Sequence, residues 1–295
     1  MDSFSIGDLQ QYSGIKAHTI RIWEQRYQAL QPHRSVGNTR LYDSQQLRRL
    51  LNIVSLIDEN HKVSTLCTLP DRKLNDLLRQ RLESVRADHP MDEYFISQLI
   101  ASALTYDEPQ FSSLYGACVQ KLGLRYTYIQ VLYPTLVRLG LMWTNEDLRP
   151  PHEHFITHLM QQKILAAVDS LPLPKSKDRV WLLFLPENEF HELGLLFAHY
   201  LLRQAGQQVI YLGPNLPEEA LRQAASTIHP THLLGFMVHR NDPETDAAYL
   251  RRLSKAHKGS QILIACDPTR PVVSPLKNLR FLHSVQDLET AFQKS

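Results

Sequence analysis

The sequence has little cysteine, little net charge and no long apolar run. Its three cysteines, Cys67, Cys118 and Cys266, lie far apart without a C-x-x-C spacing, so we expect neither a disulfide framework nor a cysteine zinc site. The formal net charge of the 295 residues is +2, which does not by itself indicate a nucleic-acid partner. No segment approaches the roughly 18 apolar residues of a membrane span, and no signal peptide is visible, so we expect a cytoplasmic protein.

Changes of pattern divide the chain into four parts. Residues 1–70 combine short helices with a basic, turn-rich loop, and residues 71–90 indicate a polar helix or linker. Residues 91–170 have helical periodicity, whereas in residues 178–295 short apolar runs alternate with helical stretches. The expected fold is multidomain α and α/β: a winged helix-turn-helix, a four-helix bundle, and a flavodoxin-like (Rossmann-type) parallel sheet with helices on both faces.

The individual elements follow from the same patterns. The bundle helices are expected at 92–104, 110–122, 126–141 and 152–167. Pro134 should kink the third of these helices, because proline removes a backbone donor. The strands are expected at 180–185, 209–212, 232–238, 261–265 and 281–284.

The first part has the helix cap and the turn residue that are typical of a helix-turn-helix. Ser5 is placed as the N-cap of a first helix, and Gly14 supplies the positive φ that a tight corner between helices needs. The second helix, from about residue 17 to 28, would enter the major groove of DNA, where its first residues meet base edges. The candidate contacts in this helix are Lys16, His18, Thr19 and Arg21.

A basic hairpin follows the second helix. Gly37-Asn38 can form a tight turn, and Arg34 and Arg40 flank it. We expect both guanidiniums and the phenol of Tyr42 to contact phosphates, as the wing of a winged helix-turn-helix does. Asp43 or Ser44 then caps the next helix.

Taken together, this part resembles the MerR family of transcriptional regulators. The resemblance implies a dimer on a roughly palindromic promoter site, with Trp23 and Glu24 in structural roles. The long dimerisation helix and cysteine-bearing loop of metal-sensing members are not visible, so metal sensing is not expected. The residues that carry the resemblance are Ser5-Ile6-Gly7-Asp8-Leu9, Ser13-Gly14-Ile15, Thr19-Ile20-Arg21-Ile22-Trp23-Glu24, Arg26-Tyr27, Pro32, Arg34 and Arg40-Leu41-Tyr42.

Trp143, Glu153 and His154 stand out in the helical part. Each has an ordinary explanation as a core or helix-terminal residue, and the His154/His158 pair has no evident third metal ligand. Their spacing resembles the helical half of the light-responsive, cobalamin-binding MerR-like repressors of carotenoid synthesis. That resemblance implies that Trp143 packs over the upper face of adenosylcobalamin, beside Glu153. It also implies that His154 takes the upper cobalt position after light removes the adenosyl group.

Glu189-x-His191-x-x-Gly194 follows the first expected strand, at the sheet edge where open α/β domains bind ligands. An imidazole can ligate a transition metal, and a carboxylate on its other nitrogen would fix the tautomer. An exposed loop histidine is the plainer interpretation. The segment resembles the cobalamin-binding D-x-H-x-x-G motif with Glu for Asp. The resemblance implies His191 as lower axial cobalt ligand and Glu189 as its support, while Gly194 lets a bulky ligand approach.

Two positions depart from the cobalamin-binding pattern. The family has a serine motif at the end of the third strand, where this chain has Gly-Phe-Met-Val-His at 235–239. It has Gly-Gly at the end of the fourth strand, where this chain has Ala265-Cys266. Phe236 or Met237 is expected to fill the channel of the nucleotide tail.

Three functions remain open. The leading one is a non-enzymatic, DNA-binding regulator. Adenosylcobalamin, clamped between the bundle and the sheet, would assemble it into a homo-oligomer in the dark, and light would disturb this assembly. The second keeps promoter binding but replaces cobalamin with another ligand or a partner protein. The third, a cobalamin-carrying part of a methyltransferase or mutase, lacks a substrate-activating domain.

Overall fold

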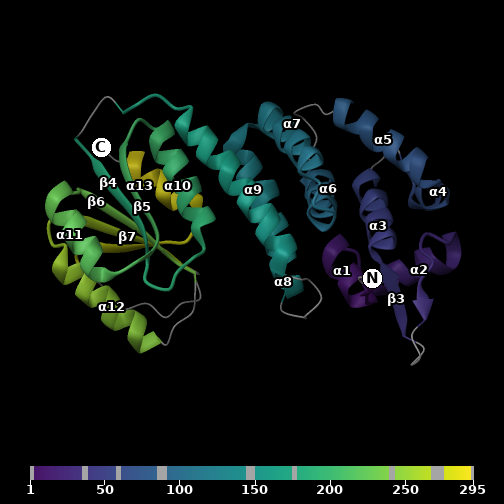
Figure 1. Ribbon diagram of the computed structural model, residues 1–295, viewed down its shortest axis with the longest axis horizontal. Helices are drawn as coiled ribbons and strands as arrows, with labels where there is room; N and C mark the ends of the chain where they lie inside the picture. Colours follow the sequence, from purple (N-terminus) through teal and green to yellow (C-terminus); the bar gives the residue numbers. More distant parts are fainter. Residues whose placement is uncertain are drawn as a thin grey trace. The chain divides into compact units, whose positions relative to one another are not determined.

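The computed structural model describes residues 3–34, 39–57, 61–84, 92–143, 150–174, 178–238, 243–266 and 276–293. The chain divides into two compact units, Met1–Leu159 and Met160–Ser295, and each is described by itself (Figure 1).

The first unit opens with the helix-turn-helix. Helix α1 (Ile6–Ser13) begins at a capping box, in which the Ser5 hydroxyl accepts from the Asp8 amide at 3.2 Å and the Asp8 carboxylate accepts from the Ser5 amide. The corner that follows has Gly14 at φ +70°, and helix α2 spans Ala17–Tyr27. The predicted cap and corner are both confirmed.

Three short strands form the wing. Strands β1 (Ser3–Phe4) and β2 (His33–Arg34) pair antiparallel with the two sides of β3 (Arg40–Asp43). The predicted Gly37-Asn38 turn lies outside the described residues. Helix α3 (Ser44–Leu56) begins at Asp43, whose carboxylate accepts from the Gln46 amide at 2.8 Å, so Asp43 rather than Ser44 is the cap.

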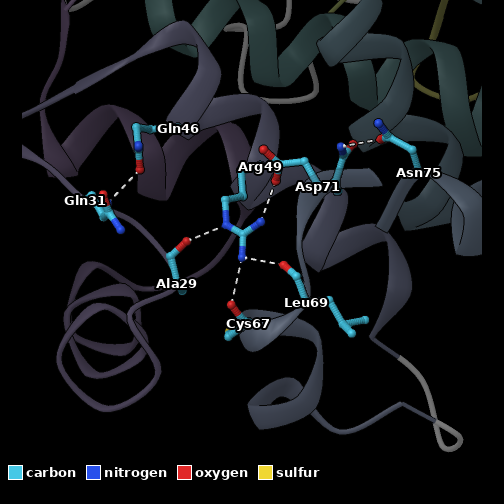
Figure 2. A network of polar contacts seen from close by, with 9 residues as sticks. Ala29, Gln31, Gln46, Arg49, Cys67, Leu69, Asp71 and Asn75 are labelled. Carbon is cyan, nitrogen blue, oxygen red and sulfur yellow. Dashed lines mark hydrogen bonds and ion pairs between the residues drawn. The ribbon is translucent and has the colours of Figure 1, made fainter. Parts of the chain in front are cut away.

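Arg49 of α3 joins the two short helices that follow, α4 (Val63–Thr68) and α5 (Asp71–Ser84). Its guanidinium donates to the carbonyls of Ala29, Cys67 and Leu69, at 2.8 Å each, and pairs with Asp71 (Figure 2). A single side chain therefore satisfies several carbonyls where the chain leaves regular helix.

Helix α6 (Asp92–Leu104) lies at the centre of the first unit. All its residues from Tyr94 to Ala103 are buried. Its Gln98 donates to Asn52 Oδ1 at 3.0 Å and to Ser55 Oγ at 3.1 Å, both on α3. The third helix of the DNA-binding part and the first helix of the bundle thus share a core and a buried polar network.

The rest of the bundle comprises α7 (Glu108–Tyr126), a π-helical segment η1 (Thr127–Leu132), α8 (Tyr133–Trp143) and α9 (Pro150–Asp169). The predicted kinked helix 126–141 is wrong in detail. The chain bends at Gly123, which has φ +77°, and widens into π geometry before Pro134. Pro134 then falls in the first turn of α8, where its missing N–H costs little.

The second unit is a five-stranded parallel sheet in the order β5-β4-β6-β7-β8, the flavodoxin-like order expected from the sequence. The buried side chains of one sheet face pack with α11 and α12, while α10 and α13 lie on the other face (Figure 1). The predicted multidomain α and α/β class is confirmed. The strands are β4 (Val180–Pro186), β5 (Gln208–Leu216), β6 (His232–Met237), β7 (Gln261–Cys266) and β8 (Leu279–Leu282), and the helices are α10 (Glu192–Gln204), α11 (Glu218–Ile228), α12 (Pro243–Ala256) and α13 (Val285–Gln293).

None of the helices in the described ranges combines the length and the apolar content that crossing a membrane would require.

Candidate functional site

The predicted base-reading residues lie on the exposed face of α2 and at its N-cap, Lys16. Lys16, His18 and Arg21 are exposed and Thr19 is partly exposed, while Ile20 of the same helix is fully buried. The helical period therefore separates a basic face from a face that packs in the core. This placement agrees with a recognition helix.

The wing is organised by Glu24 of α2. Its carboxylate accepts from Arg40 Nε and from the Tyr42 hydroxyl, both at 2.8 Å. Burial and the bond to Glu24 raise the pKa of Tyr42, so its phenol stays protonated. Glu24 therefore holds the wing strand β3 against α2, in the structural role expected for it.

Tyr42 is only 1% exposed, and this corrects its expected role. A phenol buried in this way supports the wing and does not press onto phosphates. Arg34 is exposed on β2, and Arg40 is partly exposed on β3. These two guanidiniums remain the candidate phosphate contacts of the wing.

On α9, Glu153 and His154 occupy the first turns. Glu153 accepts from the Thr157 hydroxyl at 2.8 Å, and the exposed His154 ring lies parallel to that of His158, with centroids 6.2 Å apart. Trp143 is the last residue of α8, and its side chain lies outside the described part. Within that part, no group of three metal-ligating side chains gathers.

In the second unit, Glu189 and His191 form the predicted pair at the carboxyl end of β4. Glu189 is 4% exposed, and its Oε1 lies 2.5 Å from His191 Nδ1. The same carboxylate accepts from the amides of Phe190 at 3.0 Å, His191 at 3.1 Å and Val238 at 2.7 Å. A carboxylate fixed by three amides holds the imidazole through Nδ1, which leaves Nε2 as the candidate ligating nitrogen.

The loop that carries this pair is fastened to the next strand. The Asn188 amide donates to Asn215 Oδ1 at 2.9 Å, and the Asn215 amide donates to the Glu189 carbonyl at 3.1 Å. Both asparagines have positive φ, which this residue type tolerates. Asn215 therefore fixes the Glu189–His191 loop to the end of β5.

Apolar side chains flank His191, and sequence reasoning missed them. Phe190 and Val238 are 64% and 49% exposed. They come from the loop after β4 and from the end of β6, and Glu189 ties the two segments together. Exposed apolar side chains near the His191 imidazole offer an apolar surface that a ligand can cover.

Gly194, in the first turn of α10, has a different neighbour from the one expected. A β-carbon there would lie 2.8 Å from Cε1 of Phe236. The glycine therefore makes room for a phenyl ring of the same domain, and not for a bulky ligand.

Comparison with known proteins agrees with the DNA-binding part and with the helical bundle that follows it. Residues 4–68 match the MerR HTH family regulatory protein model, and residues 95–167 match the B12 binding domain model. The chain thus has the makeup of a MerR-type DNA-binding regulator with a B12-binding domain, and the second match supports cobalamin binding.

Two similar proteins from Myxococcus xanthus are both transcriptional repressors. The chain is 27% identical over 238 residues to the HTH-type transcriptional repressor CarH, covering 77% of this chain and 76% of CarH. It is 25% identical over 299 residues to the HTH-type transcriptional repressor CarA, covering 98% and 92%. The chain is homologous to these repressors, which supports a regulator and not an enzyme.

One solved structure supports the fold. The monomethylamine corrinoid protein of Methanosarcina barkeri aligns with a TM-score of 0.55 at 13% identity, covering 69% of this chain and all of that chain. At this identity the likeness concerns the fold alone.

Proposed function

We propose that this protein is a transcriptional regulator whose oligomeric state and promoter binding are controlled by adenosylcobalamin, with light as the releasing signal. The observation that carries the proposal is the Glu189–His191 pair. It presents an imidazole, with 60% of its side chain exposed, at the ligand-binding edge of an α/β domain. The same chain has a MerR-type helix-turn-helix and repressors as relatives.

Different residues of this chain are proposed for the two sides of the cofactor. His191 is the candidate lower ligand of cobalt, and Glu189 holds its tautomer. Trp143, Glu153 and His154 are the candidates for the upper side, His154 as a cobalt ligand after photolysis. Bound adenosylcobalamin would supply a cobalt–carbon bond that light can break.

The donor set fits this group on one side. An imidazole held by a buried carboxylate suits cobalt, and Phe190 and Val238 offer apolar surface beside it. The space next to Gly194 does not fit the nucleotide arm, because Phe236 occupies it.

On the DNA side, the proposed contacts are Lys16, His18, Thr19 and Arg21 of the recognition helix and Arg34 and Arg40 of the wing. A single helix-turn-helix covers one half-site, so a roughly palindromic promoter calls for at least a dimer. Binding and assembly are therefore expected to be coupled.

The test uses the full chain, purified and handled in darkness. After incubation with adenosylcobalamin, gel filtration with absorbance detection should show a corrinoid spectrum that comigrates with the protein. Light scattering should give a larger species in the dark than after illumination, and promoter affinity should fall on illumination. His191→Ala should lose the corrinoid, whereas His229→Asn, at an exposed helix C-cap with positive φ, should retain it.

Two results would reject parts of the proposal. If no corrinoid comigrates with the wild-type protein, the proposed cofactor is rejected. Retention of corrinoid by His191→Ala at wild-type stoichiometry would remove the axial-ligand assignment.

A second candidate keeps DNA binding and replaces cobalamin with another ligand or a partner protein. The observation that favours it is Phe236 on Gly194, together with Ala265-Cys266 at the end of β7. Promoter binding that no corrinoid alters, in light or darkness, would support this candidate over the first.

A further inference from the structure

The partly exposed ring of Phe236 covers Gly194 on the side of β6 that faces α10. A β-carbon built on Gly194 would meet three atoms of this ring, at 2.8, 3.1 and 3.7 Å. The phenyl group therefore lies directly on the backbone of the first turn of α10, three residues after His191. Because even a β-carbon would overlap this ring, it fills the space between Gly194 and β6.

The neighbouring residues fix that orientation. Met237 belongs to the core on the opposite face of the sheet, with Leu250 and Leu253 of α12. Gly235 is also enclosed on that side, since a β-carbon on it would lie 3.1 Å from the Phe184 ring. Because side chains alternate along a strand, Phe236 has no other direction that keeps Met237 in the core.

The chemistry of cobalamin makes this closure significant. Its nucleotide arm hangs from the lower face of the corrin ring, the face that a protein imidazole would ligate. If His191 ligated cobalt, the displaced arm would lie on the protein side and would need a channel beside the imidazole. Phe236 occupies the space next to Gly194, so within the described residues the arm has no entry there.

The surface around His191 suits the corrin ring itself. Phe190 and Val238 are exposed and apolar, and the Glu189 carboxylate fixes both of their amides. The corrin ring needs an axial ligand and a flat apolar surface, whereas the nucleotide arm needs a deep channel in the domain.

We infer that this site, if it binds a corrinoid as proposed above, selects corrinoids that lack the nucleotide arm, of the cobinamide type, and that Phe236 sets this selectivity. Deletion of the Phe236 ring opens the space beside Gly194 and should admit the arm.

The experiment compares adenosylcobinamide with adenosylcobalamin on the full-length protein in darkness, with dissociation constants from absorbance titration. The wild-type protein should bind adenosylcobinamide at least about tenfold more tightly than adenosylcobalamin. Phe236→Ala should tighten adenosylcobalamin binding by at least about tenfold and change adenosylcobinamide binding little. Phe236→Leu, which is less disruptive, should shift the ratio in the same direction.

Phe281→Ala is the matched control. Phe281 is a partly buried ring on β8 that packs against the core of the other sheet face. Its loss should lower stability without changing the ratio of the two dissociation constants, so a change in both variants would assign the effect to general loosening of the domain and overturn the inference.

The outcomes separate this inference from the proposed function. Wild-type protein that binds adenosylcobalamin as tightly as adenosylcobinamide, or more tightly, overturns the selectivity and leaves the proposed cofactor standing. Wild-type protein that binds neither corrinoid overturns both. The wild-type ratio decides the matter even if every Phe236 variant fails to fold.

Discussion

The guanidinium of Arg138 lies against the backbone of Gly14, at 3.6 Å from the position of a β-carbon on that glycine. Arg138 also donates from both terminal nitrogens to the two carboxylate oxygens of Glu93, at 2.6 Å each. The two-point bond fixes the plane of the guanidinium. Helix α8 of the B12-binding domain is thus held next to the corner of the helix-turn-helix.

Gly14→Ala should destabilise the protein by about 1–2 kcal/mol, because an alanine is strained at φ +70°. Gly116→Ala is the control: it lies within α7 with open space around it, and it should stabilise by about 0.5–1 kcal/mol. Urea unfolding followed by circular dichroism measures both. Equal effects of the two substitutions would contradict the role assigned to the corner.

Arg49→Ala should cost about 2 kcal/mol, because three carbonyls and Asp71 lose their donor together. Arg48→Ala, one residue earlier and exposed, should change stability by less than about 0.5 kcal/mol. Thermal unfolding of the two variants compares them directly. A loss for Arg49→Ala no larger than that for Arg48→Ala would mean that water replaces the network.

Local patterns predicted much of this fold. The Ser5 cap, the Gly14 corner and the alternation of strands and helices that gives a parallel sheet follow from spacing, caps and turn chemistry, which depend on residues near one another in the chain. The carboxyl end of β5 was harder to place. This strand continues through Gly213 and Pro214 to Leu216, and its pairing with β4 becomes irregular after Leu183. Periodicity does not encode such irregularity.

Non-local packing was not predictable in the same way. Gln98 reads as a polar residue of an ordinary helix, yet it is buried against Asn52 and Ser55, more than forty positions away. The alternation of strand residues left Phe236 and Met237 as equal candidates for the tail channel. The packing of α10 and α12 on opposite faces places Phe236 against Gly194 and Met237 in the other core.

Cys67 and Cys118 should resist modification at pH 8. Burial raises the pKa of each thiol to about 11, so only about one part in a thousand is thiolate at that pH. Cys266 is partly exposed and should react first. Titration with a chromogenic disulfide should therefore show one fast thiol in the native protein and three in guanidinium chloride. Rapid reaction of all three thiols in the native state would contradict this burial.

Stability should fall as the pH drops from about 6.5 toward 4. Burial and the charge of Arg203 lower the pKa of His199 to about 4, so over this range the unfolded chain takes up a proton that the folded protein does not. With its partial exposure, His199 should account for about 1 kcal/mol. His199→Phe retains the stacking on Tyr211 and should flatten this part of the unfolding profile, whereas the exposed-site control His229→Asn should not.

Arg40 and Tyr42 should affect DNA binding in distinguishable ways. Arg40→Ala removes a proposed phosphate contact, so affinity should fall across sequences and the slope of log K against log salt should decrease by about 1. Tyr42→Phe removes only the bond from a buried phenol to Glu24, so it should weaken binding through wing position and leave the slope unchanged. Fluorescence anisotropy at several salt concentrations measures both quantities. An equal change of slope in the two variants would have one of two explanations. Either Tyr42 reaches the phosphates, which its burial argues against, or Glu24 releases Arg40 when the phenol is lost. Glu24→Gln frees Arg40 while keeping Tyr42, and it therefore separates the two explanations.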